Sequence, residues 1–270
     1  MAFQEHPEFS PPPNGDTTIW RYMDLAKFLS LIDKAALFFP RVDMLDMEDP
    51  FEGYYTSYNL TADSFVEYDT LMPDGKETTP PNRETVSQIR HQRQLLRAHV
   101  KGDRARTFVS SWHTQDHESA AMWKLYVKSG DGIAIESSYK RLVDCMATYS
   151  EFEVNVGMIN YIDYGREAIP RQNLLSPFMY KRKNFEYEKE LRALIWTPQY
   201  GKNTGGDDPA NNFISYTGLP VPVDLAILIN RVLVAPTAPA WMLDLIKSVT
   251  TRYGLNISVQ QSDLASKPIY

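Results

Sequence analysis

Cysteine is nearly absent from this chain of 270 residues, and histidine is scarce. The single cysteine, Cys145, excludes an intramolecular disulfide framework and any zinc site built from cysteines. Five histidines leave little room for a histidine-rich metal centre. The longest apolar runs hold about five residues, whereas a membrane-spanning helix needs about 20. We therefore expect a protein of a reducing compartment, the cytoplasm, with no bound metal and no membrane partner.

Three common catalytic fingerprints are also missing: G-x-S-x-G, G-x-x-x-x-G-K and G-x-G-x-x-G. Cys145 lies in an apolar, helical setting, which predicts a buried thiol rather than a nucleophile. His113 and His117 have the spacing of a helical zinc pair, with Asp116 between them. They straddle a predicted strand-to-helix turn, so we expect them to cap and to form loop hydrogen bonds.

Helices and strands alternate without a regular βαβ rhythm, which predicts one α+β domain. We expect an extended arm over 1–18 and a single domain over 19–270, with a helical insertion at about 60–105. Strands are predicted over 20–22, 37–39, 107–112, 132–136, 152–164, 191–196, 227–234 and 255–259. Helices are predicted over 25–32, 117–129, 139–146 and 240–253, with 174–190 partly helical.

The net charge of −6 is unevenly distributed. Residues 82–106 contain seven basic and two acidic side chains, and a second basic run covers 181–183. Either stretch is typical of a solvated face, but both together could guide RNA or DNA. The residues that we expect to contact such a polyanion are Arg90, Arg93, Arg97, Lys181, Arg182 and Lys183.

Three segments place charged or hydroxyl groups at predicted strand ends. They are Trp20-Arg21-Tyr22, Ser110-Ser111-Trp112, and the run from Phe185 to Arg192, which contains Glu186, Glu188 and Glu190. Each segment alone is explained by ion pairs, strand-end hydrogen bonds or an exposed charged surface. Together, in this order, they resemble the Arg–Ser–Glu class of ADP-ribosyltransferases.

That resemblance implies a split, mixed or antiparallel sheet with flanking helices, and NAD as a substrate. It implies that Arg21 holds NAD, that Ser110 and Ser111 shape the nicotinamide–ribose site, and that Glu190 bonds the ribose 2′-hydroxyl, with Glu188 upstream. The aromatic rings that could stack on NAD are those of Tyr22, Trp112 and Tyr126. This chain has Ser-Ser-Trp where the family has Ser-Thr-Ser, and Glu186-Tyr187-Glu188 fits the Glu-x-Glu pattern equally well.

Four further motifs resemble a widespread bacterial family of unknown function, from about residue 20 to 265. They are Asp49-Pro50-Phe51-Glu52, Met122-Trp123-Lys124-Leu125-Tyr126, Gly132-Ile133-Ala134-Ile135, and Phe185-x-x-Glu188-x-Glu190-x-Arg192. Members of that family are often found near mobile-element and phage-defence loci. The Asp-Pro segment is explained equally by a turn and by a place near Arg21 or the substrate.

The sequence therefore supports three hypotheses. The first is a mono-ADP-ribosyltransferase that uses NAD to modify a protein or nucleic acid, as a toxin with an antitoxin partner or as a phage-defence effector. The second is a non-catalytic binding or interaction module on the same scaffold. The third is a metal-dependent hydrolase using His113 and His117.

Overall fold

The computed structural model describes part of the chain: residues 6–45, 49–59, 91, 94, 98–127, 130–197 and 217–268. The predicted insertion at about 60–105 lies mostly outside these ranges. Arg90, Arg93 and Arg97 lie outside them too, so their expected contacts with nucleic acid are not described.

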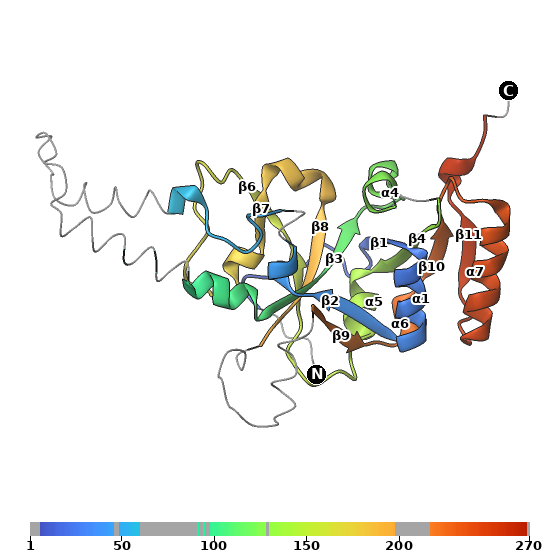
Figure 1. Ribbon diagram of the computed structural model, residues 1–270, viewed down its shortest axis with the longest axis horizontal. Helices are drawn as coiled ribbons and strands as arrows, with labels where there is room; N and C mark the ends of the chain where they lie inside the picture. Colours follow the sequence, from blue (N-terminus) through green and yellow to red (C-terminus); the bar gives the residue numbers. More distant parts are fainter. Residues whose placement is uncertain are drawn as a thin grey trace, which may run out of the picture.

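The described residues form one large mixed sheet with helices on both of its faces (Figure 1). Its strands, in spatial order, are β11 (Ser258–Gln261), β10 (Arg231–Val234), β4 (Gly132–Ser138), β1 (Thr18–Asp24), β3 (Thr107–Thr114), β8 (Glu190–Trp196) and β5 (Asn155–Met158). Only β10 and β11 pair in parallel; the other neighbours are antiparallel. The predicted α+β class, with a mixed sheet and flanking helices, is confirmed.

Two small sheets flank the large one. β2 (Ala36–Pro40) pairs with β9 (Gly218–Pro222) in antiparallel fashion, and β6 (Asn160–Ile162) pairs with β7 (Tyr180–Arg182) in parallel. Short 3₁₀ helices cover Val42–Met44, Ser176–Phe178, Lys183–Glu188 and Asp263–Ala265. The 3₁₀ helix Lys183–Glu188 leads directly from β7 toward β8, and this connection brings Glu188 and Glu190 to the start of β8.

The α-helices that lie wholly within the described residues are α1 (Leu25–Lys34), α4 (Ala120–Tyr126), α5 (Tyr139–Asp144), α6 (Leu225–Leu228) and α7 (Ala240–Arg252). Helix α1 begins where the Asp24 carboxylate accepts the backbone N–H of Lys27 at 2.8 Å, a standard N-cap. It buries Phe28, Leu31 and Ile32 at helical spacing against the sheet. Among the described helices, none has the length and hydropathy needed to cross a membrane.

The alternation of side chains along β1 separates two apolar layers. Ile19 and Met23 pack into the main core together with residues of α1, α5, α6 and α7. Trp20 and Tyr22 point to the other face, where Met122 of α4 covers them. This period of two is typical of a β-strand with both faces covered.

Strands β1 and β3 are neighbours, yet they pair at only two positions. Ile19 pairs with Thr114 and Trp20 with His113, and no further pair follows. On its other side, β1 pairs with β4 along seven positions. Strands β1 and β3 are therefore paired at the first part of β1 and separated along the rest of it.

One local prediction is wrong, a second covers two strands instead of one, and one strand was missed. The apolar run 227–234, predicted as one strand, is split between α6 and β10, because Asp224 caps a helical turn by accepting the N–H groups of Ala226 and Ile227. The β-like stretch 152–164 forms two short strands, β5 and β6. Strand β9 was not predicted, because its sequence, Gly-Leu-Pro-Val-Pro, contains two prolines.

The described part of the N-terminal arm packs on the edge strand β5. Phe9 is buried, and the carbonyl of Ser10 accepts the N–H of Met158 at 2.8 Å. A Cβ atom added to Gly157 would lie 2.7 Å from the Cα atom of Phe9. The arm therefore covers the sheet edge, and a glycine at position 157 permits this close approach.

Candidate functional site

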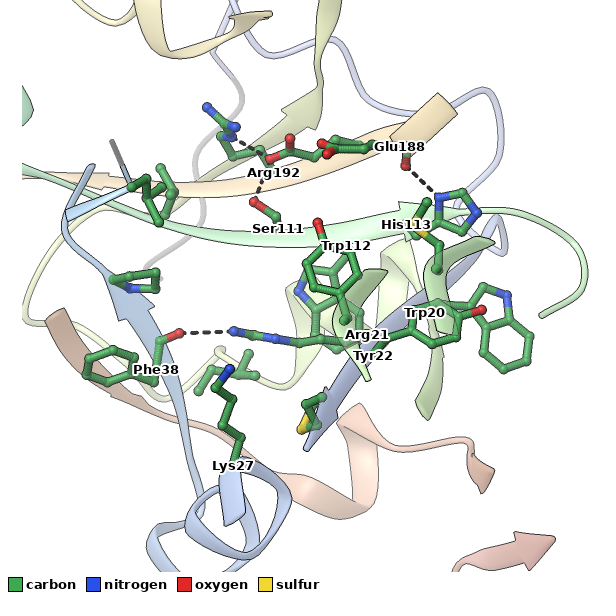
Figure 2. Close-up of a pocket in the computed structure, with 18 of the residues that line it drawn as sticks. Trp20, Arg21, Tyr22, Lys27, Phe38, Ser111, Trp112, His113, Glu188 and Arg192 are labelled. Carbon is green, nitrogen blue, oxygen red and sulfur yellow. Dashed lines mark hydrogen bonds and ion pairs between the residues drawn. The ribbon is translucent and has the colours of Figure 1, made fainter. Parts of the chain in front are cut away.

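A cavity of about 550 Å³ lies where β1 and β3 separate (Figure 2). Side chains of β1, β3 and β8 line it, joined by residues of α1, β2 and β7 and by Asp49 and Glu52. Cavities of about 300–1,000 Å³ are typical of small-molecule sites. Arg21, Ser111, Glu188 and Glu190, from three separate predicted segments, all line this one cavity.

Arg21 extends from β1 and makes contacts with neutral groups. Its guanidinium donates to Ser110 Oγ at 2.6 Å and to the Phe38 carbonyl at 3.2 Å, and it lies 5.7 Å from the centre of the Trp112 ring. Within the described residues, no carboxylate pairs with it. Burial lowers the pKa of Arg21 to about 10, which still leaves it charged at neutral pH. A partly buried cation without a counter-charge at a cavity is a candidate site for an anion.

The two predicted serines point to opposite faces of β3. Ser110 is fully buried and does not line the cavity; it acts on the site only by accepting from Arg21. Ser111 lines the cavity and donates to Glu190 Oε1 at 2.5 Å. Each serine therefore bonds one charged group of the site: Ser110 bonds Arg21, and Ser111 bonds Glu190.

Glu190 begins β8 and is almost completely buried. Its Oε1 atom accepts from Ser111 and from Arg192 Nε at 2.7 Å, and its Oε2 atom accepts from Lys181 Nζ at 3.2 Å. Burial raises the pKa of Glu190, but the charges of Arg192 and Lys181 outweigh burial and lower it to about 2. Glu190 is thus a fixed, ionised carboxylate at neutral pH.

Glu188 is held much less tightly than Glu190. Within the described residues, its carboxylate has one partner, Lys181 Nζ, at 2.6 Å from Oε2. Burial raises the pKa of Glu188, and Lys181 offsets only part of that increase. Glu186 is exposed and does not line the cavity, so the two members of the Glu-x-Glu motif at the cavity are Glu188 and Glu190.

The Asp49-Pro50-Phe51-Glu52 segment contributes two buried carboxylates to the same site. Glu52 Oε1 accepts from Arg192 Nη1 at 2.5 Å, and Asp49 Oδ1 accepts from Arg182 Nη2 at 2.7 Å. Both acids line the cavity, and both pair with arginines other than Arg21. The segment therefore lines the cavity and also forms a turn, in which Asp49 Oδ1 accepts the N–H of Phe51.

The basic run 181–183 does not form one exposed surface, contrary to expectation. Lys181 is buried among Glu52, Glu188 and Glu190. Arg182 lies between the rings of Phe51 and Phe185 while it pairs with Asp49, and only Lys183 is largely exposed. The run fails as a polyanion surface because its first two members neutralise buried acids.

The three aromatic residues predicted to stack on NAD all line the cavity. The Tyr22 hydroxyl accepts the backbone N–H of Ser119 at 2.7 Å, and its ring meets Trp123 edge to face at 5.0 Å. Trp112 is fully buried under Arg21, whereas Tyr126 is partly exposed. Tyr22 is thus held by a hydrogen bond and by a ring contact.

The two histidines diverge. His113 Nδ1 lies 2.5 Å from the Glu188 carbonyl; since a carbonyl can only accept, this nitrogen carries the hydrogen. Burial lowers the pKa of His113, which favours the neutral ring. His117 is exposed and contacts Gln115. In the part of the chain that is described, no cluster of three metal-ligating side chains occurs.

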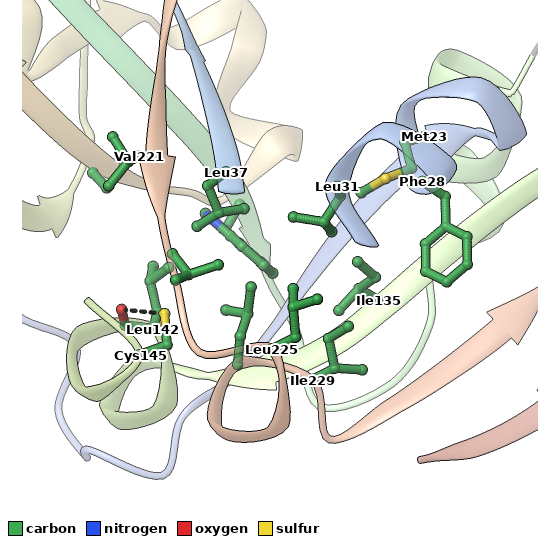
Figure 3. Close-up of a cluster of buried hydrophobic side chains, with 14 of the residues drawn as sticks. Met23, Phe28, Leu31, Leu37, Ile135, Leu142, Cys145, Val221, Leu225 and Ile229 are labelled. Atoms are coloured by element: carbon green, nitrogen blue, oxygen red, sulfur yellow. Dashed lines mark hydrogen bonds between the residues drawn. The ribbon is translucent and has the colours of Figure 1, made fainter. Parts of the chain in front are cut away.

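Cys145 follows α5 and faces the main core, beside Leu142 (Figure 3). Its thiol lies 3.1 Å from the Leu142 carbonyl. Burial raises the pKa of Cys145 to about 12, so the reactive thiolate is scarce at neutral pH. The prediction of a buried thiol is confirmed.

Three residues of the charged site were not predicted as part of it from the sequence: Arg192, Lys181 and His113. Arg192 could have been found, because it lies two residues after Glu190 in a strand and therefore on the same face. No sequence signal marks Lys181, whose acidic partners are Glu188 and Glu190, a few residues further along the chain, and the distant Glu52.

Comparisons of the chain with protein-family models, curated proteins and solved structures found no match.

Proposed function

We propose that the cavity between β1 and β3 binds NAD and that the chain is an ADP-ribosyltransferase-like enzyme. The observation that carries the proposal is that Arg21, Ser111 and Glu190 line a single cavity. They come from three strands, in the chain order of the Arg–Ser–Glu class, and they leave an unpaired cation and a fixed anion at the cavity. A dinucleotide with an anionic diphosphate and a cationic nicotinamide ring needs both.

The chemistry suits these groups. Cleavage of the bond between nicotinamide and ribose passes through an oxocarbenium-like state, which a positioned carboxylate stabilises. Glu190 supplies that carboxylate, because its pKa of about 2 keeps it ionised. Arg21 offers a planar fork of donors for the diphosphate. Tyr22 provides an aromatic face in the cavity that Arg21 and Glu190 also line.

The same proposal gives Glu188 a role toward the molecule that accepts ADP-ribose. Glu188, whose pKa is raised and whose carboxylate has one partner, is suited to receive a proton from an attacking hydroxyl or amine. We propose a protein or nucleic acid as this acceptor, and a toxin or phage-defence effector as the biological setting. An antitoxin would then be a further partner.

Release of nicotinamide from NAD tests the proposal directly. Glu190→Gln should reduce the rate by 10² or more, because it removes the anion that stabilises the developing positive charge. Glu186→Gln is the matched control: it makes the same change four residues away, outside the cavity, and should leave the rate unchanged. Absence of nicotinamide release with protein, RNA and DNA acceptors would refute the proposal, and equal rates for the two variants would refute the role of Glu190.

The second candidate is a binding module without catalysis. It is favoured by one observation: both oxygens of Glu190 are already bonded, to Ser111, Arg192 and Lys181. Such a network can serve stability alone. In that case NAD binds without being consumed, or does not bind, and Glu190→Gln changes only the free energy of unfolding.

A further inference from the structure

Lys181 lies at the centre of the buried carboxylates, although it comes from β7, outside the main sheet. Its Nζ atom is 2.6 Å from Glu188 Oε2, 3.2 Å from Glu190 Oε2 and 3.8 Å from Glu52 Oε2. No described side chain other than Lys181 bonds the Glu188 carboxylate. Lys181 is therefore placed to act on the proposed reaction through Glu188.

The carboxylates of Glu188 and Glu190 depend on Lys181 to different degrees. Glu190 also has Arg192 and Ser111, so it keeps two donors if the lysine charge is removed. Glu188 keeps none. Burial and the negative charge of Glu190 both favour the protonated form of Glu188, and Lys181 is the strongest influence in the opposite direction.

We propose that Lys181 is a positioning residue that keeps Glu188 ionised at the cavity, so that Glu188 can accept the proton of the attacking acceptor. This inference rests on the proposed function. In the step, the bond between ribose C1′ and the nicotinamide nitrogen breaks, and nicotinamide leaves as a neutral molecule. The acceptor oxygen or nitrogen bonds to C1′, and its proton passes to Glu188 and then to solvent.

Other charged or titratable groups also lie around this carboxylate. They are Glu52 of the 49–53 turn, Glu190 and Arg192 of β8, His113 of β3, whose ring bonds the Glu188 carbonyl, Tyr161 of β6, and Tyr187 and Lys189 beside Glu188 in the chain. Removal of the lysine charge alone leaves three acids facing a single arginine. The proton affinity of Glu188 must then increase.

Three variants separate charge from structure. Lys181→Met removes the charge with little change in volume, and Lys181→Arg keeps the charge. Lys183→Met is the matched control, because Lys183 is 60% exposed and pairs only with Glu167 at 3.6 Å within the described residues. If Lys181→Met does not fold, as judged by circular dichroism, Lys181→Gln takes its place.

The first readout is the carboxyl ¹³C titration of Glu188, identified as the signal that Glu188→Gln removes. In Lys181→Met the midpoint should rise by about one pH unit or more. In Lys181→Arg and Lys183→Met it should stay near the wild-type value. An unchanged midpoint in Lys181→Met would overturn the role of Lys181.

The second readout is the pH dependence of nicotinamide release. The acid side of the profile should shift upward in Lys181→Met by the same amount as the midpoint, and Lys181→Arg should restore it. A uniform loss of rate at every pH would mean that Lys181 is merely structural. If the wild-type chain releases no nicotinamide, the proposed function fails, while the ¹³C midpoint still decides whether Lys181 controls Glu188.

Discussion

Replacing Arg192 by methionine should be among the most damaging single changes in this chain. The side chain is 1% exposed and donates to Glu190 Oε1 at 2.7 Å, to Glu52 Oε1 at 2.5 Å and to the Phe178 carbonyl at 2.7 Å. Methionine fills most of the volume but leaves two buried carboxylates with Lys181 as their remaining cation. Removing one partner from a buried ion pair costs about 3–5 kcal/mol.

Urea denaturation of wild type and Arg192→Met measures this loss as a change in the free energy of unfolding. Lys140→Met is the control, because Lys140 pairs with Asp144 at the same 2.5 Å distance while 64% exposed. Exposed pairs contribute at most about 1 kcal/mol, so the control should lose far less. Comparable losses in the two variants would refute the reasoning that burial, and not distance, determines the cost.

Two more predictions follow from the fold. The low pKa of Glu190 means that its stabilising contribution, roughly 3 kcal/mol, is present above the unfolded-state pKa of about 4.3 and is lost as pH falls toward 2. The difference in unfolding free energy between wild type and Glu190→Gln should shrink over that pH range, and a constant difference would contradict this prediction. Gly157→Ala places a methyl group against the Phe9 backbone, so it should lower the free energy of unfolding by about 1–3 kcal/mol and detach the arm. Limited proteolysis should then cut near Phe9. Unchanged resistance to the protease would contradict this prediction, because it would show that the arm adapts to the methyl group.

Short-range patterns were sufficient to predict much of the fold. Local sequence patterns predicted the strands β1, β3 and β8, and helical spacing predicted α1. The same patterns failed for α6, because a short apolar run looks alike in a strand and in a helix. Whether such a run begins with a capped turn depends on one side chain, Asp224, and on what packs around it.

The candidate site divides in the same way. Arg21 and Glu190 were predicted from residue type and order, and they line the same cavity. The charged partners of Glu190 were not predicted, because Lys181 belongs to a strand outside the main sheet and its other partner, Glu52, is far away in the sequence. A basic residue next to two others in the sequence gives no sign of which one turns inward.

The short pairing between β1 and β3 has a consequence for the backbone itself. Strand edges normally lie at the rim of a sheet, where their free N–H and C=O groups invite aggregation and must be protected. Here the ladder between β1 and β3 ends at Trp20, so two edges face each other inside the molecule. A gap already occupied by Arg21 leaves no place for a strand from another chain, yet it offers peptide groups to a small ligand.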